Sequence, residues 1–284
     1  MQDNNQNPLK SYFRQPKIYI TLPSGGNFWP EGTLELPENR EVPVFSMSAK
    51  DEIMMKTPDA LISGQSTVDV IQSCIPAIKN AWKIPIIDLD AILVAIRIAS
   101  YGETMDLEIK TPVTAEQKTY ALDLRQILDS FLGNTYESKV YLNNMTVNIR
   151  PITYEEFTQT ALKTFEEQRI FKVLNDEKIS EVEKITVFQE SFKKLTAITI
   201  ANLERSISSI ELGDTTVSNP DHIKEFVENS DKEVFKSLTD HIDAQRSKFV
   251  TKPLTLQATQ EELEKGVPET YEVPVSFDSS NFFG

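Results

Sequence analysis

The stretch Ile84-Pro-Ile-Ile-Asp-Leu-Asp-Ala-Ile-Leu-Val-Ala-Ile-Arg-Ile-Ala99 decides the fold of the N-terminal half. Its apolar residues fall on nearly every side of a helical wheel, which is typical of a helix buried in a protein core. Gly102 stands where such a helix would end. One proline and three charged residues interrupt the run, which is shorter than the roughly 18 apolar residues of a membrane-spanning helix. We therefore predict a buried core helix over residues 88–101 and no membrane contact.

The residues before this stretch predict an arm followed by more helix. Residues 1–45 contain a strand-like run over residues 17–22 and spaced prolines that prevent regular helix, so we expect an extended arm or small sheet. Ser48-Ala-Lys-Asp51 fits a capping box, and Thr57-Pro58 and Ser66-Thr-Val-Asp69 predict further helix starts. The helical core expected over residues 46–102 would bury Ile53, Leu61, Ile71, Trp82, Leu89, Leu93 and Ile96.

The residues after the core helix predict short strands. Residues 105–110 alternate with period two, and residues 139–149 predict a hairpin in which Asn143-Asn144 supplies the left-handed turn. A further strand is expected near residues 118–124, with a short helix over residues 124–132. These elements predict a small mixed α+β unit.

The sequence after residue 150 predicts long helices. Thr153-Tyr-Glu-Glu156 is a capping box for a helix to about Leu174, and Ser180 starts a longer helix. Asn219-Pro220 and Ser230-Asp-Lys-Glu233 predict two more starts. The helix after Ser180 carries an apolar stripe that needs a partner, made of Val182, Ile185, Phe188, Phe192, Leu195, Ile198, Leu203, Ile207 and Ile210.

These patterns predict an α+β, helix-rich fold. The N-terminal half is a small mixed α/β half, and the C-terminal half is helical and acidic, with 16 acidic against 8 basic side chains after residue 200. We expect four parts in chain order: an extended arm or small sheet over residues 1–45, an α+β core domain over residues 46–150, a helical region over residues 151–250 and an extended tail over residues 251–284.

Composition excludes several function classes. The chain has 284 residues and a net charge of −14, so it lacks the excess of Lys and Arg that binding to nucleic acid requires. One cysteine and two histidines cannot supply the four nitrogen or sulfur ligands of a structural zinc site. No glycine-rich loop for a phosphate is present among only nine glycines. We therefore predict no cofactor, no metal site and no catalytic residue.

The residues that could carry catalysis have ordinary structural interpretations. His222 and His241 lie in predicted acidic helices and are interpreted as surface or groove histidines. Asp88 and Asp90 do not share a helix face, so we interpret them as charges that favour a helix N-terminus. Cys74 is interpreted as a buried, inert thiol. An enzyme with a carboxylate-based site is the alternative, and three or more carboxylates with shifted pKa values around one pocket would favour it.

Motifs between residues 43 and 102 carry a resemblance to a known family. They are Pro43-Val-Phe-Ser-Met-Ser-Ala-Lys-Asp-Glu-Ile-Met-Met-Lys-Thr-Pro-Asp-Ala-Leu61 with Gly64, Val70-Ile-Gln-Ser-Cys-Ile-Pro76, Trp82-Lys-Ile-Pro-Ile-Ile-Asp-Leu-Asp-Ala-Ile-Leu93, Ala95-Ile-Arg97 and Tyr101-Gly102. They resemble the baseplate protein family of T-even-type contractile-tailed bacteriophages, a family described as baseplate hub subunit or hub assembly protein. The resemblance is weaker from residue 102 to about residue 250.

The resemblance implies a non-enzymatic late phage protein. It implies a role in building the central hub of the tail baseplate, either as a resident structural subunit or as a chaperone-like assembly factor. The implied partners are other hub or tail proteins, with the tape-measure protein among the candidates. The implied location is the host cytoplasm during assembly, or the tail baseplate of the virion. The family carries no catalytic motif to transfer, and the oligomeric state stays open.

The C-terminal segment is a candidate partner-binding element. Tyr271, Val273, Val275 and Phe277 alternate on one side of a predicted strand, and Phe282 and Phe283 add apolar area at a terminus that is ordinarily polar. Two interpretations stay open. The strand docks on another chain, or it packs on its own domain by pairing with the N-terminal strand around residues 18–22.

Overall fold

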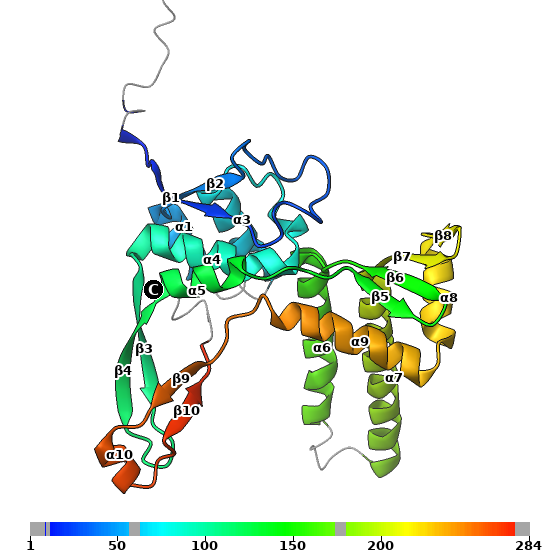
Figure 1. Cartoon of the computed structure of the whole chain (residues 1–284). Coiled ribbons are helices and arrows are strands. Elements are labelled where there is room, and N and C mark those ends of the chain that lie inside the picture. Colours follow the sequence, from blue (N-terminus) through cyan, green and yellow to red (C-terminus); the bar gives the residue numbers. More distant parts are fainter. Residues whose placement is uncertain (1–8, 10–11, 57–62, 174–179, 276–284) are drawn as a thin grey trace, which may run out of the picture.

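Helix α4 (Ile86–Tyr101) runs through the middle of the N-terminal half, as the sequence predicts (Figure 1). The computed structural model describes residues 9, 12–56, 63–173 and 180–275. Gly102 caps the C-terminal end of α4 with a φ of 97°, a backbone conformation that favours glycine. The fully buried apolar side chains of α4 are Ala91, Ile92, Val94, Ala95 and Ile96.

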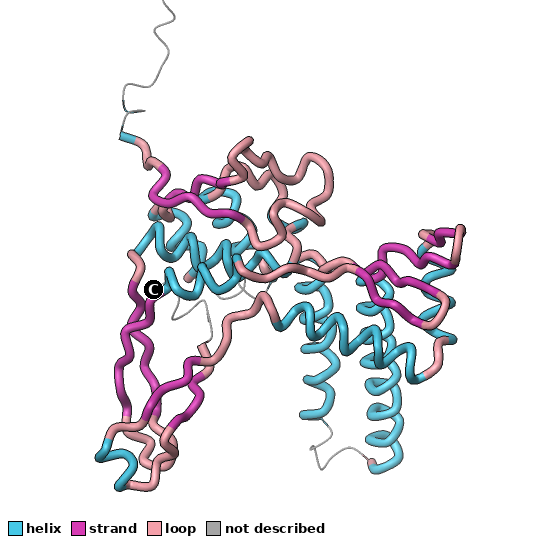
Figure 2. Tube along the Cα trace, viewed as in Figure 1, coloured by secondary structure: helices cyan, strands magenta, loops and turns pink. Residues whose placement is uncertain are grey.

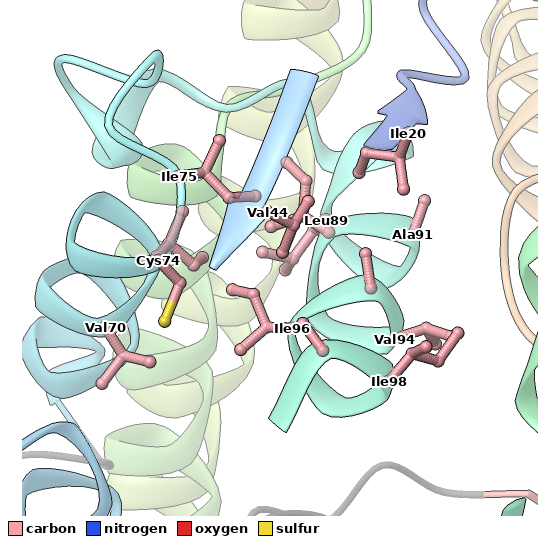
Figure 3. Close-up of a cluster of buried hydrophobic side chains, with 14 of the residues drawn as sticks. Ile20, Val44, Val70, Cys74, Ile75, Leu89, Ala91, Val94, Ile96 and Ile98 are labelled. Atoms are coloured by element: carbon pink, nitrogen blue, oxygen red, sulfur yellow. The ribbon is translucent and has the colours of Figure 1, made fainter. Parts of the chain in front are cut away.

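The first hydrophobic core is built around α4. Its other elements are β1 (Pro16–Thr21), β2 (Glu41–Phe45), α1 (Ala49–Met55), α3 (Gln65–Cys74), η2 (Ala81–Lys83) and α5 (Leu124–Leu132). Strands β1 and β2 pair antiparallel. Figure 3 shows the side chains of Ile20, Val44, Cys74 and Ile75 gathered beside Leu89 and Ile96 of α4. Burial of these side chains is the main driving force for folding of this half.

A β arm, made of residues 104–123 and 254–273, extends from the first core (Figure 2). It contains two antiparallel pairs, β3 (Thr104–Lys110) with β4 (Gln117–Asp123) and β9 (Leu254–Gln257) with β10 (Thr270–Val273). Helix α10 (Gln260–Glu264) lies at its tip. Two salt bridges, Lys118–Glu262 and Lys265–Glu116, each with a separation of 2.7 Å, join α10 and its C-terminal turn to β4 and the turn before it.

A four-stranded antiparallel sheet forms the second core. Its order is β5 (Lys139–Leu142), β6 (Met145–Ile149), β7 (Ile207–Leu212) and β8 (Thr215–Val217). Helices α8 (Pro220–Asn229) and α9 (Lys232–Ser247) pack against it together with the end of α7. The predicted hairpin over residues 139–149 is present, with Asn143 at a φ of 43°. It pairs with β7 and not with the strands of the β arm.

The helical hairpin, α6 (Tyr154–Val173) and α7 (Glu181–Ser206), projects from the body in the same direction as the β arm (Figure 1). Both starts follow the predicted capping boxes. The Thr153 N–H donates to Glu156 at 2.8 Å and the Glu156 N–H donates to Thr153 Oγ1. Ser180 and Glu183 form the second box. The architecture is therefore α+β, as predicted.

Three predictions within the first core are wrong or only partly right. Ile53 is 70% exposed, because Asp51 and Met55 form the inner face of α1 and Ile53 lies opposite them. Trp82 and Leu93 are half-buried and pack against the core, whereas Ile71, Leu89 and Ile96 are buried as expected. The predicted positions of Leu61 and of the helix start at Thr57-Pro58 lie outside the described residues.

Ser66 is not the N-cap that its sequence pattern predicts. Helix α3 starts two residues earlier, with Gly64 as N-cap at a φ of 78°, so Ser66 lies inside the first turn. Gly64 is required there because a Cβ would lie 3.1 to 3.3 Å from Tyr154, Thr158 and Trp82. A tertiary contact therefore decides this helix start, and local capping chemistry does not.

The long helix after Ser180 ends earlier than its apolar stripe predicts. Ile207 and Ile210 belong to strand β7 and not to α7. Their three-residue spacing fits a helix, but a register shift between Asn148 and Ile149 lets both isoleucines face the second core from a strand. Pairing with β6 therefore overrides the helical pattern at this point.

The strand that contains Tyr271 also has a different partner from the one expected. Strand β10 pairs with β9, with Tyr271 opposite Leu256, while β1 pairs with β2. The pairing with residues 18–22, one of the two interpretations left open, is wrong. Among the described residues, β1 pairs with β2. Only 12 residues lie between the end of β9 and the start of β10, and β9 supplies the partner of β10.

Candidate docking surfaces

Polar side chains form several of the contacts between the two helices of the hairpin. Thr160 on α6 donates a hydrogen bond to Asn202 on α7 at 2.7 Å. Lys194 on α7 pairs with Glu167 on α6 at 3.2 Å, and Ser191 is almost completely buried between them. The two helices therefore contact each other in large part through hydroxyl, amide and charged groups, which contribute little net free energy on their own.

The side of α7 carries an exposed apolar stripe. Ile185, Phe188 and Phe192 recur at three- and four-residue spacings, which places them on one face of the helix. Their exposed fractions are 57%, 48% and 61%. The rings of Phe188 and Phe192 stack with centroids 6.5 Å apart. We call these three residues the α7 stripe. It exposes aromatic area on the helical hairpin.

A groove follows the outer side of α6. It has a volume of about 510 Å³ and is lined by Gly64 and by Tyr154, Phe157, Thr158, Ala161, Leu162 and Phe165 of α6. At the Tyr154 end of the groove, the ring of Trp82 stacks on that of Tyr154, with centroids 5.6 Å apart. Phe165 at the other end is 58% exposed. The α6 groove and the α7 stripe are the apolar surfaces of the helical hairpin.

The six predicted partner-binding residues are divided by the structure. Tyr271 is only 9% exposed and is held within the β arm, and Val273 is half-buried beside it. Val275 packs against the first core. Phe277, Phe282 and Phe283 lie outside the described residues. Tyr271, Val273 and Val275 are less exposed than Glu272 and Pro274 between them, and the burial of Tyr271 requires no second chain.

Asp88 connects a loop to the core helix. It is fully buried in the first turn of α4, where its carboxylate accepts from the Ser24 N–H at 2.7 Å, the Ser24 hydroxyl at 2.5 Å and the Trp29 Nε1–H at 2.8 Å. Burial raises its pKa to about 6 and outweighs these hydrogen bonds. Asp88 thus lies in the first turn of the helix, as expected for a charge that favours a helix N-terminus. Its carboxylate, however, accepts hydrogen bonds from the loop with Ser24 and Trp29 and not from the backbone of α4.

The two aspartates do not form a catalytic pair. Asp90 accepts a hydrogen bond from the backbone of Thr251, and burial raises the pKa of Asp90. Asp88 instead accepts its hydrogen bonds from the loop that contains Ser24. In the described part of the chain, no group of three or more His, Cys, Asp or Glu side chains could hold a metal ion. Cys74 is buried, and burial raises its pKa to about 12. His241 bonds through Nε2 to the Glu137 carbonyl at 2.9 Å.

A cavity of about 250 Å³ lies where the two cores meet. Arg150 and Arg246 line it together with Tyr136 and Asn202. Arg150 already makes two hydrogen bonds to Glu156, at 3.0 and 2.7 Å, so its charge is neutralised inside the protein. Burial opposes ionisation of Glu156, but hydrogen bonds from Arg150 and Thr153 outweigh it and lower the pKa. Of the two arginines that line this cavity, Arg150 is therefore already paired within the protein.

Sequence reasoning anticipated part of these surfaces. The apolar periodicity of α7 predicts a stripe that needs a partner, and Ile185, Phe188 and Phe192 are exposed members of it. The groove on α6 was missed because its lining residues mix aromatic, alanine and threonine side chains with Gly64 from another element. None of the helices among the described residues is both long enough and apolar enough to span a bilayer.

Comparison with known proteins identifies the family of the chain. A family model described as T4 bacteriophage base plate protein matches residues 15–269, which include both cores, the helical hairpin and most of the β arm. No curated protein and no solved structure matches the chain. The chain therefore belongs to the T4 bacteriophage base plate protein family, and this membership implies a structural or assembly role among the other proteins of the phage tail.

Proposed function

We propose that the protein acts in assembly of the baseplate hub through protein–protein contacts, as a chaperone-like assembly factor without catalytic activity. The observation that carries the proposal is the helical hairpin, which projects from the body and exposes the side chains of Phe165, Phe188 and Phe192. A resident hub subunit is the second form of the same proposal. The strongly acidic composition, with a net charge of −14, favours a transient soluble complex over a permanent one.

The α7 stripe supports a contact with another protein. Aromatic side chains contribute more binding free energy per residue than other side chains when a partner buries them. Three exposed apolar side chains on one face of a projecting helix form a continuous contact surface, and scattered single residues would not. We infer that another hub or tail protein covers this stripe, with the tape-measure protein as one candidate.

The C-terminal segment is a second proposed contact. Tyr271 is held within the β arm and Val275 packs on the first core, so the proposed contact is limited to the residues after Val275. Phe277, Phe282 and Phe283 come after them in the sequence, and aromatic side chains contribute strongly to binding when a partner buries them. In this proposal Tyr271, Val273 and Val275 anchor the segment, and the three phenylalanines make the contact.

One experiment separates an assembly factor from a resident subunit. Hub complexes captured from infected cells and finished tails are compared by quantitative mass spectrometry. We expect the protein in hub intermediates and a strong depletion, of about tenfold or more, in finished tails. Its presence in finished tails at a fixed ratio to other baseplate proteins would identify a resident subunit instead.

A second experiment tests the α7 stripe itself. We expect Phe188→Ser combined with Phe192→Ser to reduce capture of hub proteins about tenfold or more, because two aromatic contacts are lost. Tyr141→Ser is the matched control, since Tyr141 is an exposed aromatic residue on β5, away from the hairpin. Equal capture by both variants would contradict a role for the stripe.

A further inference from the structure

A small pocket lies in the seam between α6 and α7, the two helices of the hairpin (Figure 1). It has a volume of about 170 Å³ and shares no residue with the α6 groove or the α7 stripe. Its apolar wall is formed by Ala197, Ile198 and Ala201 of α7. Its polar lining residues are Thr160 and Lys163 of α6 and Asn202 and Arg205 of α7. We call it the seam pocket.

The seam pocket carries positive charge without a matching acid. Lys163 and Arg205 line it, and among the described residues no Asp or Glu does. Within that same part of the chain, the ion pair between the two helices uses Lys194 and Glu167, and neither Lys163 nor Arg205 has an acidic partner. Arg205 is half-buried, so its guanidinium loses part of its hydration and gains no ion pair in exchange. In a chain with a net charge of −14, these two cations form a local exception.

Asn202 adds a hydrogen-bond donor to the same pocket. Its Oδ1 atom accepts from the Thr160 hydroxyl at 2.7 Å, which fixes the orientation of the amide. The Nδ2 group makes no hydrogen bond to any described residue. Lysine, arginine and an amide nitrogen all donate and do not accept. A ligand that satisfies the three groups must therefore supply acceptor oxygens and negative charge, and a carboxylate supplies both.

The next turn of the hairpin already contains such a contact. Glu167 lies four residues after Lys163 on α6, and its carboxylate pairs with Lys194 of α7 at 3.2 Å. The Glu167 side chain is only 12% exposed, so a carboxylate fits between the two helices at this level. At the level of the seam pocket, the described chain offers two cations and no carboxylate. A carboxylate from outside the chain would take the corresponding place there.

The surroundings of the pocket restrict what can carry this carboxylate. A net charge of −14 repels nucleic acid and any strongly acidic protein, and it disfavours a second copy of the chain for the same reason. The wall formed by Ala197, Ile198 and Ala201 favours apolar side chains beside the bound group. These features fit one acidic side chain within an otherwise apolar segment.

We propose that the seam pocket binds the carboxylate of a single Asp or Glu side chain within an apolar segment of a partner protein. Lys163 and Arg205 pair with the carboxylate, and Asn202 Nδ2 donates a further hydrogen bond. The helical hairpin thereby selects partner segments by charge in addition to binding apolar area. The inference concerns the binding chemistry of the hairpin and does not depend on the role in hub assembly.

Fluorescence anisotropy with two labelled peptides and the full-length protein tests the proposal. Both peptides consist of Leu, Ala and Ser and differ in one central residue, which is Glu in one and Gln in the other. We expect the Glu peptide to bind about tenfold more tightly, because the Gln peptide cannot form the charge-assisted contacts. Lys163→Gln and Arg205→Gln should each weaken binding of the Glu peptide about tenfold and leave the Gln peptide unchanged. Lys193→Gln removes an exposed lysine of α7 outside the pocket, and this control should change neither affinity.

Several outcomes would overturn the inference. Equal affinities of the two peptides, or no saturable binding up to about 1 mM, would show that the pocket does not bind a carboxylate. Equal weakening by Lys193→Gln would show a general charge effect. Displacement of the Glu peptide by less inorganic phosphate than acetate would assign the pocket to phosphate, and self-association abolished by Arg205→Gln would assign it to a second copy. Arg205→Lys keeps the charge and should bind better than Arg205→Gln; equal loss in both would indicate damage to the hairpin instead.

Discussion

At the scale of single residues, burial in the first core separates side chains that look alike in the sequence. Ile53, Leu93 and Ile92 all follow helical apolar patterns, yet Ile53 is exposed, Leu93 is half-buried and Ile92 is fully buried. Periodicity identifies an apolar face, but it does not say how much of a short helix a neighbouring element covers. That information lies in the packing of α1 and α4 against the rest of the core.

We expect Ile92→Ala to lower the free energy of unfolding by about 2 to 5 kcal/mol, the usual cost of truncating a fully buried aliphatic side chain. Leu93→Ala should cost clearly less, because Leu93 is half-buried. Ile53→Ala is the control and should leave stability nearly unchanged. Urea unfolding of the three variants measures these values, and a cost for Ile53→Ala equal to that for Ile92→Ala would contradict the described packing.

Asp88 gives the stability a specific pH dependence. Its pKa is about 6 in the folded protein against an ordinary 3.8, so the folded state holds this proton more tightly than the unfolded state. The contribution of Asp88 to stability is therefore largest below about pH 4 and is lost as the pH rises through about 6. Asn does not titrate, so the stability of the natural protein relative to Asp88→Asn should fall between pH 4 and pH 7. Parallel stability curves from urea unfolding across that range would refute this assignment.

At the scale of elements, capping chemistry predicts a helix start correctly where no distant element crowds the cap position. The boxes at Ser48, Thr153 and Ser180 are present, because their partners lie within three residues. Gly64 replaces Ser66 as N-cap because Tyr154, Thr158 and Trp82 crowd that position from distant elements. Likewise β7 replaces the last predicted turn of α7 because β6 offers a strand partner. Long-range contacts are not visible in a local pattern.

The β arm depends on one nearly buried carboxylate. Glu262 is almost completely covered, and hydrogen bonds from Lys118 and the Thr259 backbone lower its pKa to about 2 against an ordinary 4.5. Because the folded pKa is depressed, the stabilisation is complete above about pH 4.5 and is lost as the pH falls toward 2. We expect Glu262→Gln to speed amide hydrogen exchange in β9 and β10 at neutral pH. Glu116→Gln, at an exposed pair, should change it much less, and equal effects would argue against a special role for Glu262.

At the scale of the whole molecule, composition supports a further expectation. The few histidines and cysteines, the scarcity of glycine and the lack of a metal-binding group among the described residues predict that the protein works without zinc, magnesium or ATP. A ligand that binds the native state stabilises it by RT ln(1 + [L]/Kd) and so raises the melting temperature. Thermal unfolding should therefore not shift when any of the three is added. A reproducible, saturable shift would contradict the non-enzymatic proposal.

The overall architecture was less predictable than its parts. The sequence correctly indicates the α+β class and most helices and strands. It does not indicate that residues 139–149 and 207–217 form one sheet, because the two segments are 57 residues apart and pair only through β6 and β7. Nor does it indicate that polar side chains join α6 to α7. The candidate surfaces depend on this arrangement, since it determines which apolar residues stay outside.

The pairing of Ile149 with Ile207 makes the helical hairpin an insertion whose two ends meet at one point of the sheet. The length of such an insertion can change while the register of the surrounding strands stays the same, because each doubling of a closed loop costs only about 0.6 kcal/mol of chain entropy. Removing one heptad from each helix beyond Leu162 and before Leu195 would shorten the projection by about 10 Å. The length of the hairpin can thus change without disturbing the sheet, and under the proposed function this length would set the distance from the body at which a partner protein is bound.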